Sequence, residues 1–377
     1  MLLTSTSIDY FCAAQMEKDI LAGKPAVSRL KYLHLSLITN LGLLAFFKYF
    51  NFFIDSFLSL FDVLGVHLSA PAMRIILPIG ISFYTFQALS YTIDVYSGKL
   101  HATKSFWDFF LAVLFFPHLI AGPIQRAANL LSQVTSPRVI SRTKIVDGLH
   151  LMLWGYFKKV YVADGLAPIV SGVFNASTYS GGETTIAVLA FAFQIYCDFS
   201  GYTDIARGVA KLMGFEFVLN FNLPYFATNP SDFWKRWHIS LSTWLRDYLY
   251  VPLGGNQHGT VKTYRNLMIT MVLGGLWHGA AWNFVLWGAY HGGLLVVHRS
   301  FTPILSGLRL CTSAMLRRLW LSFRILVMFI FTCYGWLLFR ATSFHEIVSM
   351  TASLARPLDG LPVQSLQTVL TLIAPVV

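Results

Sequence analysis

Charged side chains are scarce in this sequence. Asp, Glu, Lys and Arg make up 12% of the 377 residues, whereas hydrophobic residues make up 55%. Ordinary soluble domains carry about 25% charged residues, and a chain this apolar has too few polar groups to cover its surface in water. The composition therefore disfavours a soluble protein and predicts an all-α, polytopic membrane protein.

Acidic residues are outnumbered by basic ones. The 28 Lys and Arg against 17 Asp and Glu give a formal net charge of +11. The basic residues flank apolar runs, which is the pattern that the positive-inside rule describes for cytoplasmic loops. Nucleic-acid binding would need a basic face on a soluble domain. We find no such face and expect no nucleic-acid partner.

Cysteine is also rare, and several common catalytic motifs are missing. Cys12, Cys197, Cys311 and Cys333 are far apart and show neither CxxC nor zinc spacing, so we expect no disulfide framework, no metal site and no bound cofactor. GxSxG, GxxxxGK[ST], HExxH and a strand followed by GxGxxG do not occur. Their absence disfavours the commonest serine hydrolases, nucleotidases and zinc proteases. The first 20 residues lack the features of a signal peptide.

Apolar runs dominate what is present. The run at 32–50 follows Lys24, Arg29 and Lys31, which places its start on the cytoplasmic side. At about 20 residues per span, we predict roughly 8–10 membrane-embedded helices. Without an internal repeat or a soluble segment, the economical expectation is one membrane domain over residues 1–377, with a motif core at about 40–340.

One apolar stretch, FWDFFLAVLFFPHLIAGPIQR at 106–126, has basic residues on both flanks. Pro117 and the Gly122–Pro123 pair interrupt it. Flanks on the same side together with helix breakers predict a re-entrant hairpin. Irregular backbone at membrane depth is tolerated where protein or a water-filled cavity surrounds it, so this hairpin indicates an internal cavity.

The stretch SDFWKRWHISLSTWLRDYLYVPLGGN at 231–256 predicts one amphipathic helix within it. Asp232 is a candidate cap for a helix beginning at Phe233, and Pro252 ends it. An apolar stripe follows spacings of three and four: Trp234, Trp237, Leu241, Trp244 and Tyr248. This stripe fits an interfacial anchor. An anchor does not explain His238, which lies at the polar boundary of the stripe. Substrate binding and catalysis are both open for this residue.

The segment 265–292, RNLMITMVLGGLWHGAAWNFVLWGAYHG, is almost wholly apolar yet contains His278 near its middle. A polar group in hydrocarbon is costly unless it is satisfied, and ionisable residues there usually face a bundle interior or a wet cavity. Gly274, Gly275 and Gly279 would allow close approach of a backbone or a substrate. A structural histidine bonded to a neighbouring helix is the alternative for His278, and the favoured interpretation for His291.

Two carboxylates, Asp198 and Asp204, end another apolar segment. Glycosidases use paired carboxylates, but nothing here resembles a soluble sugar cleft. Arg207 follows Asp204 by three residues, so we expect a structural ion pair instead.

Three ordered stretches together resemble the membrane-bound O-acyltransferase family: FFPHLIAGPIQR, the region from YCDFSGYTDIARG to VPLGGN, and the segment 265–292. The resemblance is greatest to the bacterial branch that contains the membrane subunit of alginate O-acetylation. The D-alanyl transfer protein of teichoic-acid modification is a more distant relative. Family members usually carry further apolar spans at both ends, so we expect this chain to be a shortened member.

The resemblance implies an acyltransferase with a funnel and tunnel through the bilayer. The near-universal family histidine corresponds to His278 in LWHG, and the second motif residue to His238 in WHISLS. It therefore implies that His278 is the catalytic base and that His238 supports it. We expect the substrate-binding residues to be Trp277, Lys235, Arg236 and Arg246, with the basic ones attracting donor phosphates.

The resemblance also implies the partners. The donor would be a cytoplasmic acyl thioester such as acetyl-coenzyme A, and the acceptor an exported polysaccharide, often served by a periplasmic acetyl-handling protein. The location would be the lipid of the bacterial cytoplasmic (inner) membrane, with multiple passes. Two alternatives stay open: a transporter or channel, and a non-catalytic scaffold. The identities of the polymer and of the acyl group, and the oligomeric state, are left open.

Overall fold

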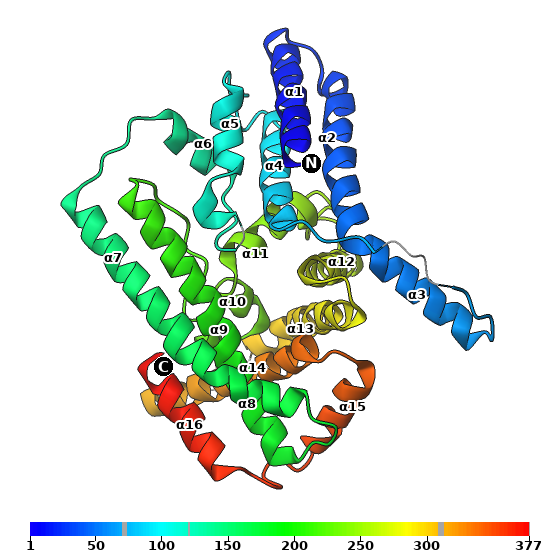
Figure 1. Ribbon diagram of the computed structural model, residues 1–377, viewed down its shortest axis with the longest axis vertical. Coiled ribbons are helices and arrows are strands. Elements are labelled where there is room, and N and C mark those ends of the chain that lie inside the picture. The colour runs from blue at the N-terminus through cyan, green and yellow to red at the C-terminus, as the bar shows by residue number, and fades with distance from the viewer. Residues whose placement is uncertain (70–73, 120, 308–312, 377) are drawn as a thin grey trace. The chain divides into compact units, whose positions relative to one another are not determined.

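The computed structural model describes residues 1–69, 74–119, 121–307 and 313–376. Within these ranges every regular element is a helix, which confirms the predicted all-α class (Figure 1). Contacts divide the chain into two compact units, Met1–Ile145 with Ala210–Val218, and Val146–Val209 with Leu219–Val377. The single membrane domain over 1–377 stays a prediction.

The first unit is built on three helices that lie side by side, α1 (Leu2–Leu21), α2 (Leu30–Leu44) and α4 (Ile81–Tyr96) (Figure 1). Asp9 of α1 is fully buried between them. Its carboxylate accepts hydrogen bonds from Ser36 Oγ at 2.6 Å and Asn40 Nδ2 at 2.8 Å. Buried carboxylates need such partners, so this network fixes α1 against α2. The unit's other elements are a 3-10 turn Ala26–Arg29, a π-helical turn Ala45–Tyr49, α3 (Phe50–Val63), α5 (Phe106–Val113), a 3-10 turn Phe116–His118 and α6 (Ala127–Thr135).

The predicted break in the stretch 106–126 is present. Helix α5 ends before Leu114, and Pro117 lies in the short 3-10 turn that follows. Buried His118 then contacts Gln87 of α4, with 2.9 Å between Nε2 and Oε1. The chain therefore bends back onto α4, as a hairpin requires, although its depth in a membrane stays a prediction. Ile120, part of the quoted motif, lies outside the described residues.

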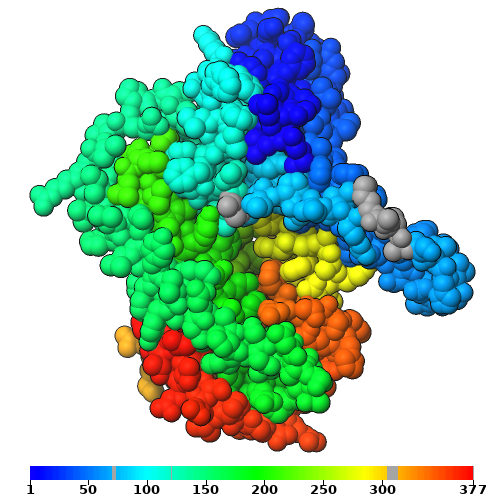
Figure 2. All heavy atoms as spheres, in the orientation of Figure 1, coloured from blue at the N-terminus to red at the C-terminus, as the bar shows by residue number. Residues whose placement is uncertain are grey.

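The second unit contains all or most of ten α-helices among its described residues, several of them long. They are α7 (Arg142–Tyr156), α8 (Asp164–Phe174), α9 (Gly181–Leu212), α10 (Pro230–Trp234), α11 (Ile239–Leu245), α12 (Thr260–His278), α13 (Trp282–Gly307), α14 (Ala314–Arg340), α15 (Phe344–Ser353) and α16 (Val363–Ile373). Helix α16 packs against α8, as the red and green surfaces of Figure 2 show. Two π-helical turns, Phe157–Ala163 and Arg246–Tyr250, extend α7 and α11.

Three helical segments of the described chain are long and apolar enough to cross a membrane: Ala26–Val63, Gly181–Leu212 and Ala314–Arg340. Shorter apolar helices cover Phe106–His118 and Val363–Val376. The predicted total of 8–10 embedded helices stays a prediction, because helix length and composition alone do not place a bilayer.

The prediction of one continuous amphipathic helix that begins at Phe233 and ends at Pro252 is wrong. The segment divides into α10, α11 and the π-helical turn, and the break lies at His238, whose φ of 43° is left-handed. Asn220 stabilises the break, because its carbonyl accepts from Ile239 N at 2.9 Å and its Oδ1 accepts from Ser240 N at 3.2 Å. The helix cap is Asn229, whose side chain accepts from Asp232 N, and not Asp232 itself.

The apolar stripe of this segment was predicted to be an interfacial anchor, but most of it is buried in the protein. Trp237, Leu241 and Trp244 are 3%, 2% and 7% exposed. Trp237 belongs to the core of the second unit, where it stacks on Phe233. The tryptophans therefore pack largely inside the protein, because the break at His238 turns the two short helices inward.

Candidate active site

His278 ends helix α12 and does not lie in the middle of one span. Gly279 is extended, with φ of −162°, and α13 begins at Trp282. Helices α12 and α13 form a tight hairpin in which a side chain at Gly288 would come within 3.0 Å of Val272 Cα. Gly288 thus allows the two helix backbones to pack closely. This packing brings the Trp287 ring to 5.2 Å from the His278 ring.

Aromatic rings surround His278. Trp277 lies at 5.1 Å and Phe339 of α14 at 5.4 Å between ring centroids. Asn283 donates hydrogen bonds to the carbonyls of Phe339 and Ala341 at 3.2 and 3.0 Å. This polar side chain therefore anchors the end of α14, and with it the ring of Phe339, beside the histidine.

The structure brings His238 next to His278, although 40 positions separate them in the chain. Their ring centroids lie 6.3 Å apart, and the Phe199 ring lies 4.7 Å from His238. His238 is 1% exposed, and neither ring nitrogen has a hydrogen-bond partner among the described residues. Burial, and secondly the proximity of His278, hold the pKa of His238 well below its usual value. His238 is thus neutral at pH 7.

A cavity of about 370 Å³ opens beside His278. We call it the His278 cavity. It is lined by Ser231, Trp234, Lys235, Ile239, Leu241, Ser242, Thr243, Leu245, Arg246, Tyr250, Leu267, Thr270, Met271, Gly274, His278, Trp287, Leu295 and Arg299. Lys235 and Arg246 of the predicted substrate-binding set belong to this lining. Trp277 and Arg236 are outside it, and Trp277 instead packs against both histidines.

The basic residues differ in their ion pairs. Arg246 Nε lies 2.6 Å from Asp247, and Arg236 Nε lies 2.8 Å from Asp232. Lys235 and Arg299 have no carboxylate within 4.0 Å in the described part of the chain. The unneutralised positive charge of the cavity therefore rests on Lys235 and Arg299. The sequence interpretation missed Arg299, because a basic residue after an apolar run reads as an ordinary cytoplasmic flank.

His291 lies close to this site but does not line its cavity. It is 1% exposed and lies 4.9 Å from the Trp287 ring. The Trp234 ring also lies 5.2 Å away. Its position inside an aromatic cluster fits a structural role, but neither ring nitrogen has a hydrogen-bond partner among the described residues, so the expected bond to a neighbouring helix is not found there.

The two carboxylates of α9 are occupied by ion pairs. Asp204 lies 3.4 Å from Arg207, as predicted, and also 2.6 Å from buried Lys158, which the sequence interpretation missed. Asp198 pairs with Lys159. Each carboxylate thus pairs with its own lysine, and the two ion pairs connect α9 to the π-helical turn Phe157–Ala163. Cys12, Cys197 and Cys333 are free thiols, and Cys311 lies outside the described residues.

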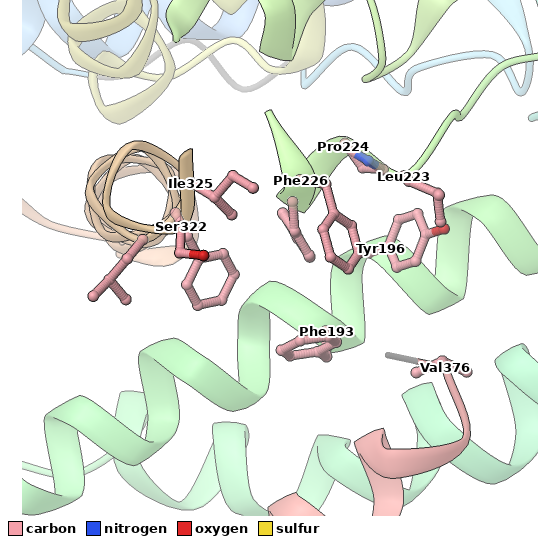
Figure 3. Close-up of a pocket in the computed structure, with 11 residues that line it drawn as sticks. Phe193, Tyr196, Leu223, Pro224, Phe226, Ser322, Ile325 and Val376 are labelled. Carbon is pink, nitrogen blue, oxygen red and sulfur yellow. The ribbon is translucent and has the colours of Figure 1, made fainter. Parts of the chain in front are cut away.

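A second pocket of about 360 Å³ is almost wholly apolar (Figure 3). Phe193 and Tyr196 of α9, Phe226, and Ile325 of α14 point into it. It contains no histidine or charged side chain among its lining residues. The chemistry-bearing side chains therefore gather at the His278 cavity.

Comparison with known proteins gives matches over most of the chain. The family model for MBOAT, the membrane-bound O-acyltransferase family, matches residues 103–341. The probable alginate O-acetylase AlgI of Azotobacter vinelandii is 43% identical over 88% of this chain and 64% of that protein. The peptidoglycan O-acetyltransferase of Helicobacter pylori is 34% identical over 93% and 68%. The teichoic acid D-alanyltransferase of Bacillus subtilis is 27% identical over 73% and 72%. The chain thus spans just under two thirds of the length of the alginate relative.

Proposed function

Because this chain belongs to the membrane-bound O-acyltransferase family, we propose that it transfers an acetyl group from a thioester to a hydroxyl of an exported polysaccharide. Its family and the three apolar helices of spanning length among its described residues make it a multi-pass membrane protein. Two of the similar proteins are named for O-acetylation of alginate and of peptidoglycan, which supports acetyl as the group and a glycan polymer as the acceptor.

The observation that carries this proposal is the place of His278 on the wall of a cavity. Its neighbours in the cavity are largely apolar, including Trp287, Met271 and Leu241. Such walls exclude water, which would otherwise hydrolyse a thioester. An imidazole on the wall of such a cavity is suited to take a proton from an attacking hydroxyl.

In the proposed reaction, a ring nitrogen of neutral His278 accepts the proton of the acceptor hydroxyl. The hydroxyl oxygen attacks the thioester carbonyl, so a C–O bond forms and the C–S bond breaks. The departing thiolate takes the proton from His278 and leaves as a thiol. The hydroxyl belongs to the polysaccharide or to a periplasmic partner that relays the acyl group. We place the protein in the bacterial cytoplasmic membrane.

His238 supports this cycle through its charge state. Its ring lies 6.3 Å from His278 and its nitrogens are desolvated. A second imidazolium at this distance would oppose protonation of His278. A neutral His238 leaves His278 free to carry the proton during the transfer.

The test is acetylation of surface glycan in cells that carry His278→Ala, compared at equal protein level with His345→Ala. His345 is exposed on α15, outside the described cavities. Removal of a general base lowers the rate by about 10²–10⁴-fold, whereas the control should retain full activity. Undiminished acetylation with His278→Ala would refute the catalytic role. Movement of an intact solute without any acyl donor would favour a transporter.

A further inference from the structure

The His278 cavity follows the α12–α13 hairpin away from His278. On α12 its lining residues Leu267, Thr270, Met271, Gly274 and His278 recur at spacings of one, three and four, so they share one helix face. On α13 the lining residues are Trp287, Leu295 and Arg299. Gly288 faces Met271 while Gly292 faces Met268, so the two helices run antiparallel. Leu267 and Arg299 therefore lie at the end of the cavity opposite His278.

Helix geometry gives the length of this path. Arg299 follows Trp287, the residue in ring contact with His278, by three and a third turns of α13. At ~1.5 Å per residue this separation is roughly 18 Å. The positive charge of Arg299 and the imidazole of His278 thus mark two remote ends of one cavity.

Another hollow, distinct from the apolar pocket of Figure 3, adjoins the His278 cavity at its Arg299 end. This Arg299 hollow, of about 470 Å³, is lined by Ser231, Leu267, Leu295, His298, Arg299, Thr302 and Pro303. Ser231, Leu267, Leu295 and Arg299 also line the His278 cavity. Among the described residues that line the two spaces there is no Asp or Glu. A basic region with no acidic residue in its lining attracts an anion, and arginine matches the oxygens of a phosphate by bidentate hydrogen bonding.

We propose that Arg299 binds the phosphate of the acyl donor and so determines which donors the protein accepts. The inference rests on the proposed function, because it assigns a residue to the donor of that reaction. A donor with its phosphate at Arg299 reaches His278 only if a long arm separates the phosphate from the acyl carbon. An acyl phosphate, in which one oxygen joins the two groups, is excluded by this geometry.

The wall between the two ends suits such an arm. Ser242, Thr243 and Thr270 each donate their hydroxyl proton to a backbone carbonyl, at 3.1, 2.8 and 2.7 Å. Their oxygens therefore retain lone pairs that can accept from amide N–H groups. A phosphopantetheine arm, with amides between its phosphate and its sulfur, presents such groups along its length.

The decisive experiment measures binding, which needs neither acceptor nor turnover. The purified full chain in detergent is titrated calorimetrically with pantetheine and with 4′-phosphopantetheine. A hydrogen-bonded charge of this kind contributes about 10- to 100-fold in affinity, so the phosphorylated arm should bind tighter by that factor. Arg299→Gln should remove most of the preference, and Arg299→Lys should restore part of it. Arg317→Gln, at an exposed position of α14 outside both spaces, is the matched control.

The assignment is overturned by an Arg299→Gln protein that retains the full preference, or by a wild-type protein that shows none. If Arg299 binds a lipid headgroup instead, its substitution changes the affinities for both arms equally, which also overturns it. Repeating the titration with coenzyme A and with a phosphopantetheinylated carrier protein identifies which source of this phosphate is bound. His278→Ala should keep the preference while losing acetyl transfer, so a failure of the proposed function is separable from a failure of the Arg299 assignment.

Discussion

The contact between helices α12 and α13 gives a sharp prediction through Gly288. A methyl group added there would lie 2.9 Å from Val272 Cα and 3.0 Å from the Met271 carbonyl carbon. Carbon atoms in contact prefer about 3.5–4.0 Å, so Gly288→Ala must part the helices by up to about 1 Å. Overpacking of this kind destabilises by about 1–3 kcal/mol.

The same shift should separate His278 from the groups around it. Misplacement of a catalytic group by about 1 Å lowers activity by about 100-fold. Gly293→Ala is the matched control on the same helix, because its added methyl meets nothing within 4 Å of the described structure. Both substitutions gain about 1 kcal/mol of helix propensity, so the difference between the two variants isolates the contact.

The assay is acetyl transfer per unit of protein, together with thermal unfolding in detergent. We expect Gly288→Ala to unfold at a lower temperature and to lose most transfer, and Gly293→Ala to equal or exceed the wild type in stability. Equal activity and equal stability of the two variants would refute the reasoning, since the close approach of the backbones would then play no part in positioning His278.

Further predictions concern the surroundings of the site. Asn220→Ala removes the Oδ1 that accepts hydrogen bonds from Ser240 N and Oγ at 3.2 and 2.9 Å and should destabilise by about 1–3 kcal/mol, measured by denaturant unfolding. Lys158→Ala breaks a buried ion pair and should destabilise by about 3–5 kcal/mol; its half-exposed neighbour provides the control Lys159→Ala, expected to change stability by less than about 1 kcal/mol. Because the folded protein depresses the pKa of His238, the unfolded chain binds the extra proton below about pH 6.5. Stability should therefore fall as the pH drops through that value, and an acid-unfolding series should show less of this fall with His238→Gln.

Some features of the site could be predicted because their signals are local. The apolar composition alone predicts helices in a membrane, since such a backbone must satisfy its polar groups internally. His278 stood out as an imidazole in an apolar segment, and the motifs around His238 singled out the second histidine. The pair Asp204–Arg207 followed from a spacing of three on one helix. The pair Asp232–Arg236 had a similar signal, a spacing of four.

Other features depended on contacts that no local pattern contains. The break at His238 arises because Asn220, 18 positions earlier, takes the backbone N–H groups of Ile239 and Ser240. The apolar residues of 231–256 do follow helical spacing, but the hydrogen bonds from Ile239 and Ser240 to Asn220 interrupt the helix. Lys158 meets Asp204 across 46 positions, and only the packing of their helices brings the two charges together.

The amino-acid sequence was sufficient for the all-α class and for singling out His278 and His238 as candidates, because hydrophobicity and motif are properties of neighbouring residues. Tertiary structure decided which charges are free. Arg236, Arg246, Lys235 and Arg299 look alike in the sequence, yet two of them are neutralised by carboxylates and two line the cavity without one. Charge pairing depends on distance in space, so the residues left to meet an anionic donor emerge only when the chain is folded.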